Sequence, residues 1–142
     1  MVDFLDKKSE QEIIGAIREA EKWTSGEIRV HVKKRSKRDA LKYAERVFHL
    51  LGMHKTNHRN GILIFVALDS RVFAIIGDQG IHDRVGVDFW DKTRDIMGPY
   101  FSRGQIKEGA IAGVLSAGEQ LKAHFPHEKA DSNEIPNKVT HD

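Results

Sequence analysis

Residues 61–77, GILIFVALDSRVFAIIG, decide the fold of this chain. The first part, Gly61 to Leu68, is apolar at every position after the glycine, which is typical of a strand that is covered on both faces. Asp69 and Ser70 form a tight turn, and Arg71 to Ile76 return beside the strand just completed. The stretch therefore predicts an antiparallel hairpin whose first arm lies inside a sheet.

A further strand is predicted upstream of the hairpin. Residues Glu27 to Val32 alternate polar and apolar side chains, which is the period of a half-buried strand. A helix that Asp39 caps and Gly52 ends separates it from the hairpin. The residues expected on the inner face of this helix are Leu41, Ala44, Val47, Phe48 and Leu51. Because a helix joins the two strands, they are expected to be parallel.

Three more helices complete the pattern. The first follows Ser9-Glu10-Gln11-Glu12, which has the form of a capping box, and carries an apolar stripe from Ile13 onward. The second lies between Val85 and Phe101 and is expected to stop at Gly98-Pro99. The third lies between Gln105 and His124. It carries Gly109, Gly113 and Gly118 on nearly one face, which predicts close contact with a neighbouring element.

The resulting order, α-β-α-β-β-α-α, predicts an α/β fold with a mixed, mostly parallel sheet, one antiparallel hairpin and helices on both faces. A length of 142 residues suits one domain. We expect this domain to span residues 1–125. The remaining residues, 126–142, are polar and are expected to form a disordered tail.

Composition excludes several classes of protein. The chain has no cysteine, so disulfide scaffolds, thiolate zinc sites, iron–sulfur sites and cysteine-nucleophile enzymes are ruled out. Its longest apolar run, Ile62 to Leu68, is seven residues, against the ~20 of a membrane helix. The opening MVDFLDKKSEQ shows no cationic segment leading into an apolar run, as a signal peptide would. We therefore expect a cytoplasmic protein that does not insert into membranes.

Five of the six residues from Lys33 to Arg38 are basic. The favoured interpretation is a solvated connection between strand and helix. The start of the following helix offers an anion site as a second interpretation. Nucleic acid is the third, but no aromatic residue interleaves the run and the net charge is only +2, so no nucleic-acid partner is expected.

Polar residues gather at the edge of the sheet opposite this basic run. If the strands run as predicted, one cleft is bordered by Glu27, Asn60, Asp78, His82, Asp83 and Asp88. Carboxylate and amide oxygens are the ligands that Ca²⁺ or Mg²⁺ prefers, so the edge is a candidate cation site. The alternative is that Asp78 and Asp83 are ordinary turn and helix-capping residues. The histidines lack the paired spacing of a helical zinc site.

The succession TSGEIRV (24–30), a helix, and RNGILIFVALDSRVFAIIGDQGIHDRV (59–85) resembles the TPM-domain family. That family is named for thylakoid lumen proteins linked to photosystem II repair and for a nematode acetylcholine-receptor modulator. The resemblance implies a three-layer α/β/α sandwich of Rossmann-like outline, with one further short strand. It also implies binding of divalent cations, calcium especially, and the acid phosphatase activity of plant members. The metal ligands carried over by motif position are Asn60, Asp78 and Asp83, and beside them Glu27 and Asp88.

Two functions are therefore weighed, beside a purely structural role without a ligand. The first is a cation-responsive interaction or regulatory module that binds a protein, a membrane-associated one included. The alternative is a weak metal-dependent phosphatase acting on phosphate monoesters. There, metal-activated water would attack, Arg59 or Arg84 would bind the phosphate, and His82 would supply the proton.

Overall fold

The computed structural model describes residues 5–36, 39–86, 88–127 and 139–141, and its centre is a four-stranded sheet. The strands are β1 (Glu27–Lys33), β2 (Gly61–Ala67), β3 (Val72–Gly77) and β4 (Val139–His141). They lie side by side in the order β3-β2-β1-β4. β1 is parallel to both β2 and β4, whereas β2 and β3 are antiparallel. The predicted mixed, mostly parallel sheet with one hairpin is confirmed.

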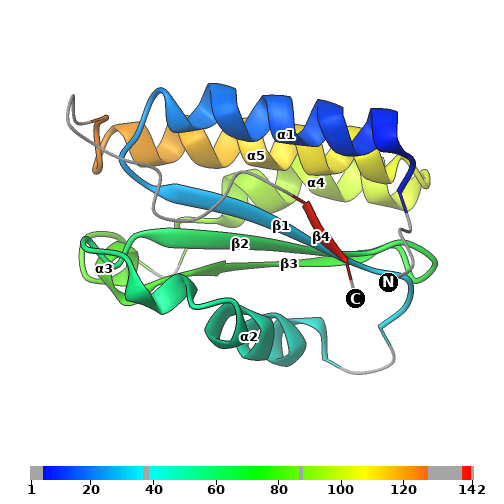
Figure 1. The fold of residues 1–142 in the computed structure, drawn as a ribbon, viewed down its shortest axis with the longest axis horizontal. Helices are drawn as coiled ribbons and strands as arrows, with labels where there is room; N and C mark the ends of the chain where they lie inside the picture. Colours follow the sequence, from blue (N-terminus) through cyan, green and yellow to red (C-terminus); the bar gives the residue numbers. More distant parts are fainter. Residues whose placement is uncertain (1–4, 37–38, 87, 128–138, 142) are drawn as a thin grey trace.

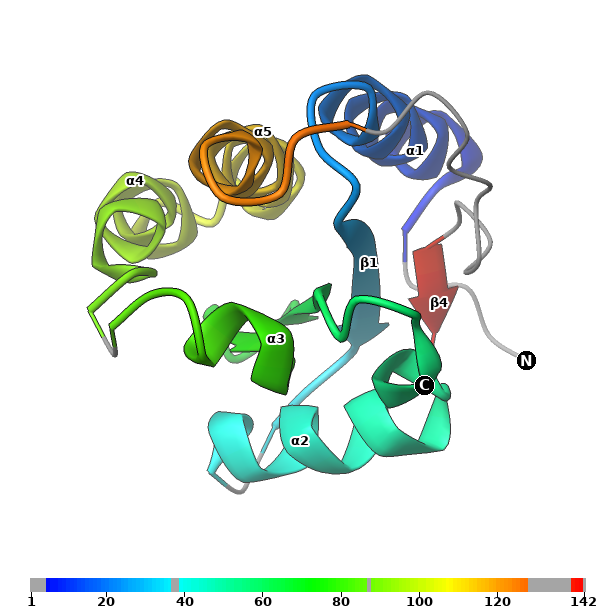
Figure 2. The same cartoon turned by 90° about the vertical axis from the view of Figure 1, so that its left-hand side faces the viewer.

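Helices cover both faces of the sheet, which gives three layers (Figures 1 and 2). On one face lie α1 (Lys7–Glu21), α4 (Asp91–Ser102) and α5 (Ile106–Lys122), and on the other lies α2 (Ala40–Leu50). The short elements η1 (Met53–Lys55) and α3 (Gln79–His82) sit at one end of the sheet. The α/β/α sandwich is thereby confirmed. Among the described residues, none of the helices combines the length and the apolar character needed to cross a bilayer.

Both faces of β2 are buried, as its apolar sequence predicts. Side chains at alternate positions point to opposite faces of a strand. Ile62, Ile64 and Val66 therefore join the core under α1 and α5. Leu63 and Phe65 join a second core under α2. This two-sided burial places β2 inside the sheet and leaves β3 at its rim.

The register of the sheet brings three chain segments to one edge. Glu27 lies opposite Gly61 in the parallel pair, and Ile62 lies opposite Gly77 in the antiparallel pair. The starts of β1 and β2 and the end of β3 are therefore neighbours, as predicted. The basic run lies at the other edge, where the amide of Asp69 donates to the carbonyl of Lys34.

Several local predictions are wrong. α3, which is absent from the predicted order of elements, begins directly after Asp78, whose side chain caps it. α4 passes through Pro99 to Ser102, because burial of Met97 and Phe101 offsets the missing hydrogen bond. Leu41 is 48% exposed rather than packed beneath α2.

The fourth error concerns the polar segment from residue 126 to 142. Val139–His141 form β4, which pairs with β1 through the partners Val30 and Val139. Pro126 forms an isolated bridge with Thr24. The expectation of disorder is therefore wrong for these residues, while 128–138 and 142 lie outside the described residues. Val139 of β4 is buried, with 4% of its surface exposed. The mostly polar composition of the segment does not predict this burial.

The cap of α1 also differs from the predicted capping box. Asp6, not Ser9, caps the helix, because the amide of Ser9 donates to Oδ1 of Asp6 at 2.7 Å. Hydrogen bonds from the backbone amide and from the side chain of Ser9 lower the pKa of Asp6. We expect Asp6→Ala to lower the melting temperature at pH 7 more than Ser9→Ala, which keeps the backbone donor.

The pH dependence of this cap follows from the direction of the pKa shift. A carboxyl group whose pKa is lowered on folding stabilises the native state above its unfolded pKa of about 3.8. The stabilisation is lost as the pH falls through the lower, folded value. The difference in melting temperature between the wild-type chain and Asp6→Ala should therefore shrink below about pH 3.8. A difference that persists unchanged at pH 2 would contradict the role of the Asp6 carboxylate.

Candidate functional site

Three loops meet at the α3 end of the sheet. They precede β1, precede β2 and follow β3. A hydrogen bond between two side chains and another between two backbone groups hold them together. The side-chain amide of Asn60, which is 1% exposed, donates to Oγ of Ser25 at 3.1 Å. The amide of Asp78 donates to the carbonyl of Gly61 at 3.0 Å. Residues remote in sequence thus form one small polar site.

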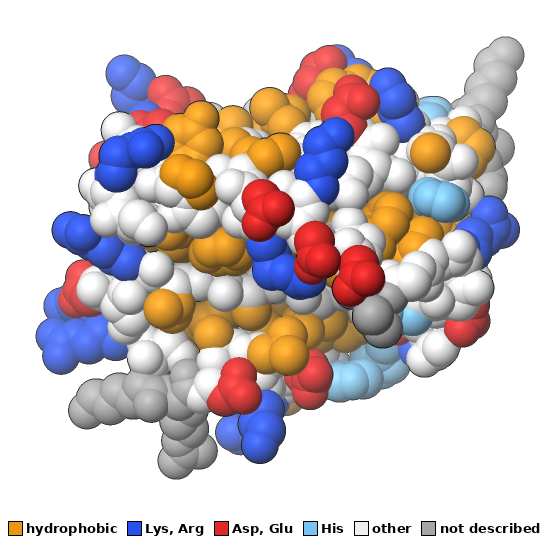
Figure 3. All heavy atoms as spheres, turned by 180° about the vertical axis from the view of Figure 1, so that it is seen from behind, with side chains coloured by type: hydrophobic (Ala, Val, Ile, Leu, Met, Phe, Trp, Pro, Cys, Tyr) orange, Lys and Arg blue, Asp and Glu red, His pale blue; other side chains and the backbone are white. Residues whose placement is uncertain are grey.

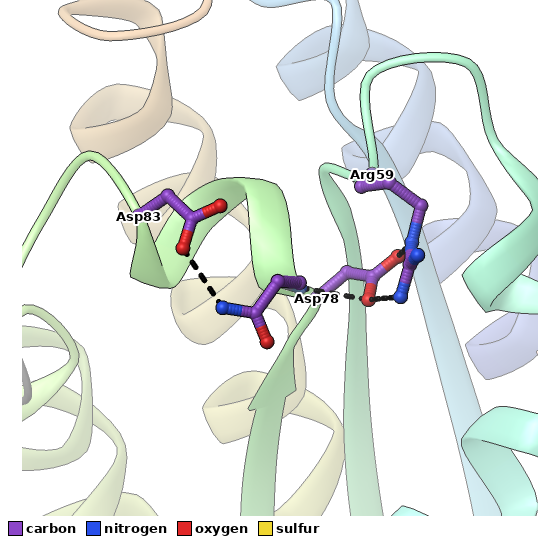
Figure 4. A network of polar contacts seen from close by, with 4 residues as sticks. Arg59, Asp78 and Asp83 are labelled. Atoms are coloured by element: carbon purple, nitrogen blue, oxygen red, sulfur yellow. Dashed lines mark hydrogen bonds and ion pairs between the residues drawn. The ribbon is translucent and has the colours of Figure 1, made fainter.

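The centre of this site is an ion pair between Arg59 and Asp78 (Figure 4). Nε of Arg59 lies 2.8 Å from Oδ2 of Asp78, and Nη2 lies 2.9 Å from Oδ1. Such a two-point contact fixes both planar groups in orientation. The Asp78 side chain is only 5% exposed, whereas that of Arg59 is 49% exposed. A buried carboxylate is thus covered by a cation that borders solvent.

The charges of this pair affect each other directly. Hydrogen bonding and attraction to Asp78 raise the pKa of the Arg59 guanidinium, so it stays charged at any physiological pH. Asp78 has a second role, since Oδ1 also accepts from the amide of Gln79 at 2.7 Å at the start of α3. Asp78 therefore caps a helix, which was the alternative predicted for it, and it is also a buried carboxylate paired with Arg59. Its predicted role as a metal ligand stays a prediction.

Gly80 fixes the position of the Arg59 loop. Its amide donates to the carbonyl of Arg59 at 2.8 Å. A Cβ at position 80 would lie 2.2 Å from the carbonyl oxygen of His58 and 2.6 Å from that of Arg59. Arg59 itself adopts a φ of 51°, in the left-handed region that few side-chain-bearing residues occupy. The close approach of α3 and this loop holds Arg59 where its guanidinium reaches Asp78.

Of the other predicted residues, Asp83 is close enough for its charge to raise the pKa of Arg59 as well. Glu27 is 6% exposed at the start of β1. Asp83, at the end of α3, accepts from the side-chain amide of Gln79 at 2.8 Å. Asp88 lies beyond α3, where its carbonyl accepts from the amide of Asp91. The residues placed near Asp78 are therefore Asn60 and Asp83, while Asp88 belongs to the turn before α4.

The three candidate catalytic side chains each have different contacts. Arg59 is bound to Asp78. Arg84 donates to the carbonyl of His124 at 2.7 Å, and its guanidinium lies 4.8 Å from the centre of the Phe125 ring. His82 is exposed on α3 and lines a groove of about 410 Å³ that opens beside Asp78. The two arginines thus bind different partners and do not form a single phosphate-binding site.

The described residues do not form a ready-made metal centre. Within residues 5–36, 39–86, 88–127 and 139–141, no group of three or more His, Asp or Glu side chains is placed to hold a metal ion. Both oxygens of Asp78 are taken up by Arg59. The donor types, carboxylate and amide oxygen, suit Ca²⁺ or Mg²⁺, but the arrangement fits such an ion only if Arg59 leaves Asp78.

The basic run at the opposite edge has the contacts of a surface connection. Lys33 lies over the ring of Tyr43, with Nζ 4.7 Å from its centre. Arg35 forms an ion pair with Asp69 at 3.5 Å, and both side chains are at least half exposed. Lys37 and Arg38 lie outside the described residues.

The sequence predicted Asp78 as a metal ligand of the cleft and, separately, Arg59 as a phosphate ligand of the alternative phosphatase. The structure pairs them with each other. The hairpin register contains the signal for this pairing, because it sets Ile62 opposite Gly77 and so brings the residues just outside the hairpin together. The groove beside the pair was not predicted, since its walls come from α2 and from the turn before α4.

Comparisons with solved structures show the same architecture in three other proteins. The BA42 protein of Bizionia argentinensis is 44% identical, with a TM-score of 0.91 over 100% of this chain and 98% of that one. The N-terminal domain of a P. gingivalis protein is 21% identical, with a TM-score of 0.70, over 87% and 81% of the two chains. The N-terminal domain of cg2496 from Corynebacterium glutamicum is 14% identical, with a TM-score of 0.65, over 96% and 80%.

The last two likenesses show the fold alone. A search of curated proteins gave no match. The family model described as the TPM domain matches residues 1–120, which is most of the chain. This match leads to one conclusion. The chain belongs to the TPM domain family.

Proposed function

We propose that this TPM domain is an interaction module whose α3 edge responds to Ca²⁺ or Mg²⁺. The observation that carries the proposal is the ion pair itself: a 5% exposed carboxylate balanced by a 49% exposed guanidinium. Arg59 can turn into solvent without leaving a cavity in the core, and Asp78 would then be a buried anion without its cation. A divalent cation would compete with Arg59 for this carboxylate.

The surroundings of Asp78 suit this exchange. Asn60 is buried beside the loop that carries Arg59, and Asp83 lies at the far end of the single helical turn that Asp78 caps. These residues offer hard oxygen donors, which calcium and magnesium prefer. Because the same loop and helix meet through Gly80, a change at Asp78 would alter the surface that both segments present. The partner we propose for that surface is a protein, and the cytoplasm is the proposed compartment.

The alternative, hydrolysis of phosphate monoesters, has less support from the geometry. It needs arginines that are free to bind phosphate, yet Arg59 is bound to Asp78 and Arg84 to the carbonyl of His124. Among the described residues, His82 is the one catalytic candidate that lines the groove without a side-chain hydrogen bond or ion pair. We therefore place the interaction role first.

Removing the competing guanidinium should strengthen cation binding. We expect Arg59→Gln to bind calcium about three- to tenfold more tightly than the wild-type chain, because the cation no longer displaces an ion pair. Binding should raise the melting temperature by mass action and shift the amide signals of residues 25–27, 59–61 and 78–83. Calcium titration followed by backbone NMR measures both the affinity and the place of binding.

Two variants serve as controls. Arg84→Gln removes the same charge from the same end of the molecule without touching Asp78, so its calcium affinity should match that of the wild-type chain. Asp78→Asn keeps a helix-capping side chain but loses the charge, and it should abolish the response. If calcium at about 10 mM leaves these amides and the melting temperature unchanged in both the wild-type chain and Arg59→Gln, the proposal is wrong.

A further inference from the structure

One face of β1 carries a row of polar side chains. Side chains of a strand point alternately to its two faces, and the core under α1 and α5 takes Ile28, Val30 and Val32. The residues that point to the other face, on which α2 lies, are Glu27, Arg29, His31 and Lys33. The β2 partner of Arg29 is Leu63, which belongs to the core under α2. Arg29 is therefore a cationic side chain on an inner face of the sheet.

The charge of Arg29 is buried and is not neutralised. The residue is 5% exposed, and its Nε is buried without a hydrogen-bond partner. Among the described residues, none forms an ion pair with this guanidinium or accepts a hydrogen bond from it. Burial is the one cause that shifts the pKa of Arg29, and it lowers the pKa. A guanidinium still keeps its charge at neutral pH, so the folded chain holds an unbalanced buried cation.

Other basic side chains of the molecule are placed differently. Arg59 is bound by Asp78, and Arg94 is paired with Asp91. Figure 3 shows basic side chains that stand at the surface, several of them beside acidic ones. Water or a neighbouring acid solvates the charge in such places. Arg29 has little of either, and a buried charge without a partner destabilises a fold. An anion that reached Arg29 would remove this cost.

The donors of Arg29 and the charges near it indicate which anion fits. The planar fork of a guanidinium matches the two oxygens of a carboxylate. Glu27, two residues away on the same face, is acidic, and Lys33 lies over the ring of Tyr43 at the far end of the strand. One unbalanced cation is neutralised by one carboxylate, whereas a phosphate dianion would bring a second buried charge that nothing balances.

The guanidinium is open to a ligand at its outer end. Of its three nitrogens, Nε is the one that is sealed from solvent without a partner. Nη1 and Nη2 are not sealed in this way, and they have no hydrogen bond to a described residue. A carboxylate can therefore approach the two terminal nitrogens.

We propose that Arg29 binds a carboxylate group on the α2 face of β1, at a site separate from the Arg59–Asp78 pair. The carboxylate accepts hydrogen bonds from the guanidinium and neutralises its buried charge. It belongs either to a small acid or to an acidic side chain of a partner protein, since both present the same group. The inference goes beyond the cation response and does not rest on it, because it uses neither Arg59 nor Asp78.

The test is a titration of the full chain with sodium acetate at pH 7 in EDTA, at an ionic strength kept constant with sodium chloride. We expect the side-chain Nε–H signal of Arg29 to shift saturably, with a dissociation constant of about 10 mM. Acetate at about 100 mM should raise the melting temperature by about 4 °C over the same concentration of chloride. Both measurements need no substitution in the chain.

Three variants separate the charge of Arg29 from its shape. Arg29→Met removes the charge and should melt about 4 °C higher than the wild-type chain in chloride, without a response to acetate. Arg29→Lys keeps the charge but lacks the fork, and it should bind acetate about tenfold more weakly. Arg46→Met is the control, because Arg46 is exposed on α2. Its melting temperature should stay within about 1 °C of the wild-type value, and its acetate response should be unchanged.

The source of the carboxylate is distinguished by a second probe, N-acetylglutamate methylamide, whose one carboxylate is that of a glutamate side chain within a peptide. Binding of this compound at least as tight as that of acetate would assign the site to a partner protein. Binding of acetate alone would assign it to a small acid.

Several results would overturn the proposal. These are no saturable shift of the Arg29 signal at about 100 mM acetate, an equal acetate response of Arg29→Met and the wild-type chain, or a lower melting temperature of Arg29→Met in chloride. Tighter binding of inorganic phosphate than of acetate would also contradict the choice of a carboxylate. Acetate binding without a calcium response would refute only the cation proposal, and the reverse would refute only the Arg29 site.

Discussion

Gly80→Ala is expected to lower the free energy of unfolding by about 3 kcal/mol, which corresponds to a melting temperature about 10 °C lower. The added methyl group would lie 2.2 Å from the carbonyl oxygen of His58, a distance that no relaxed structure allows. The obstacle is backbone rather than a flexible side chain, so α3 and the loop before β2 must move apart. That movement would also break the bond from the Gly80 amide to the carbonyl of Arg59.

Thermal and urea denaturation of Gly80→Ala measure this loss. Gly86→Ala is its matched control, because a Cβ at position 86, just beyond α3, has no atom within 4 Å. We expect the control to stay within about 0.5 kcal/mol of the wild-type chain. Equal stability of the two variants would show that α3 and the Arg59 loop do not approach as described. If both loops move apart, Gly80→Ala should also respond to calcium differently from the wild-type chain.

Gly118→Ala is expected to destabilise the fold by about 2 kcal/mol, although alanine is the better helix former. A Cβ on Gly118 of α5 would lie 2.7 Å from Cβ of Ala20 and 3.2 Å from its Cα. α1 and α5 are thus in contact nearly backbone to backbone. The two helices must separate to admit a methyl group, and the core beneath them would loosen.

Gly15→Ala isolates the effect of helix propensity. Gly15 is exposed inside α1, and a Cβ there would have no atom within 4 Å. This variant should therefore gain up to about 1 kcal/mol of stability. Opposite signs for the two substitutions, measured by chemical denaturation, are the expected result. A stabilising Gly118→Ala would contradict the close packing of α1 on α5.

The sequence predicted most of the architecture because its signals are local. The run from Gly61 to Leu68 could be buried only inside a sheet, and the turn at Asp69-Ser70 set the direction of the returning strand. Together they predict that Glu27, Asn60 and Asp78 lie at one edge of the sheet, and the strand register confirms this. The glycines of α5 likewise predicted close contact with a neighbouring element. Gly118 makes this contact with Ala20 of α1.

The sequence failed where a long-range contact overrides a local preference. β4 is a short polar segment that forms a strand only because the edge of β1 is available to it. α4 continues through Pro99 because the side chain of Phe101 is buried in the core, which stabilises the last turn. Leu41 fits the inner stripe of α2 by spacing, yet the sheet beneath it ends at β3 and leaves it exposed.

Hydrophobic periodicity and turn chemistry, which each act over a few residues, therefore determined the elements, their order and the polar edge of the sheet. Only the tertiary structure decided that Arg59 covers Asp78 and that α2 and the start of α4 line the groove beside this pair. These features depend on side-chain orientation and on how far each helix extends past the sheet. Both are set by packing between segments that lie far apart in the chain.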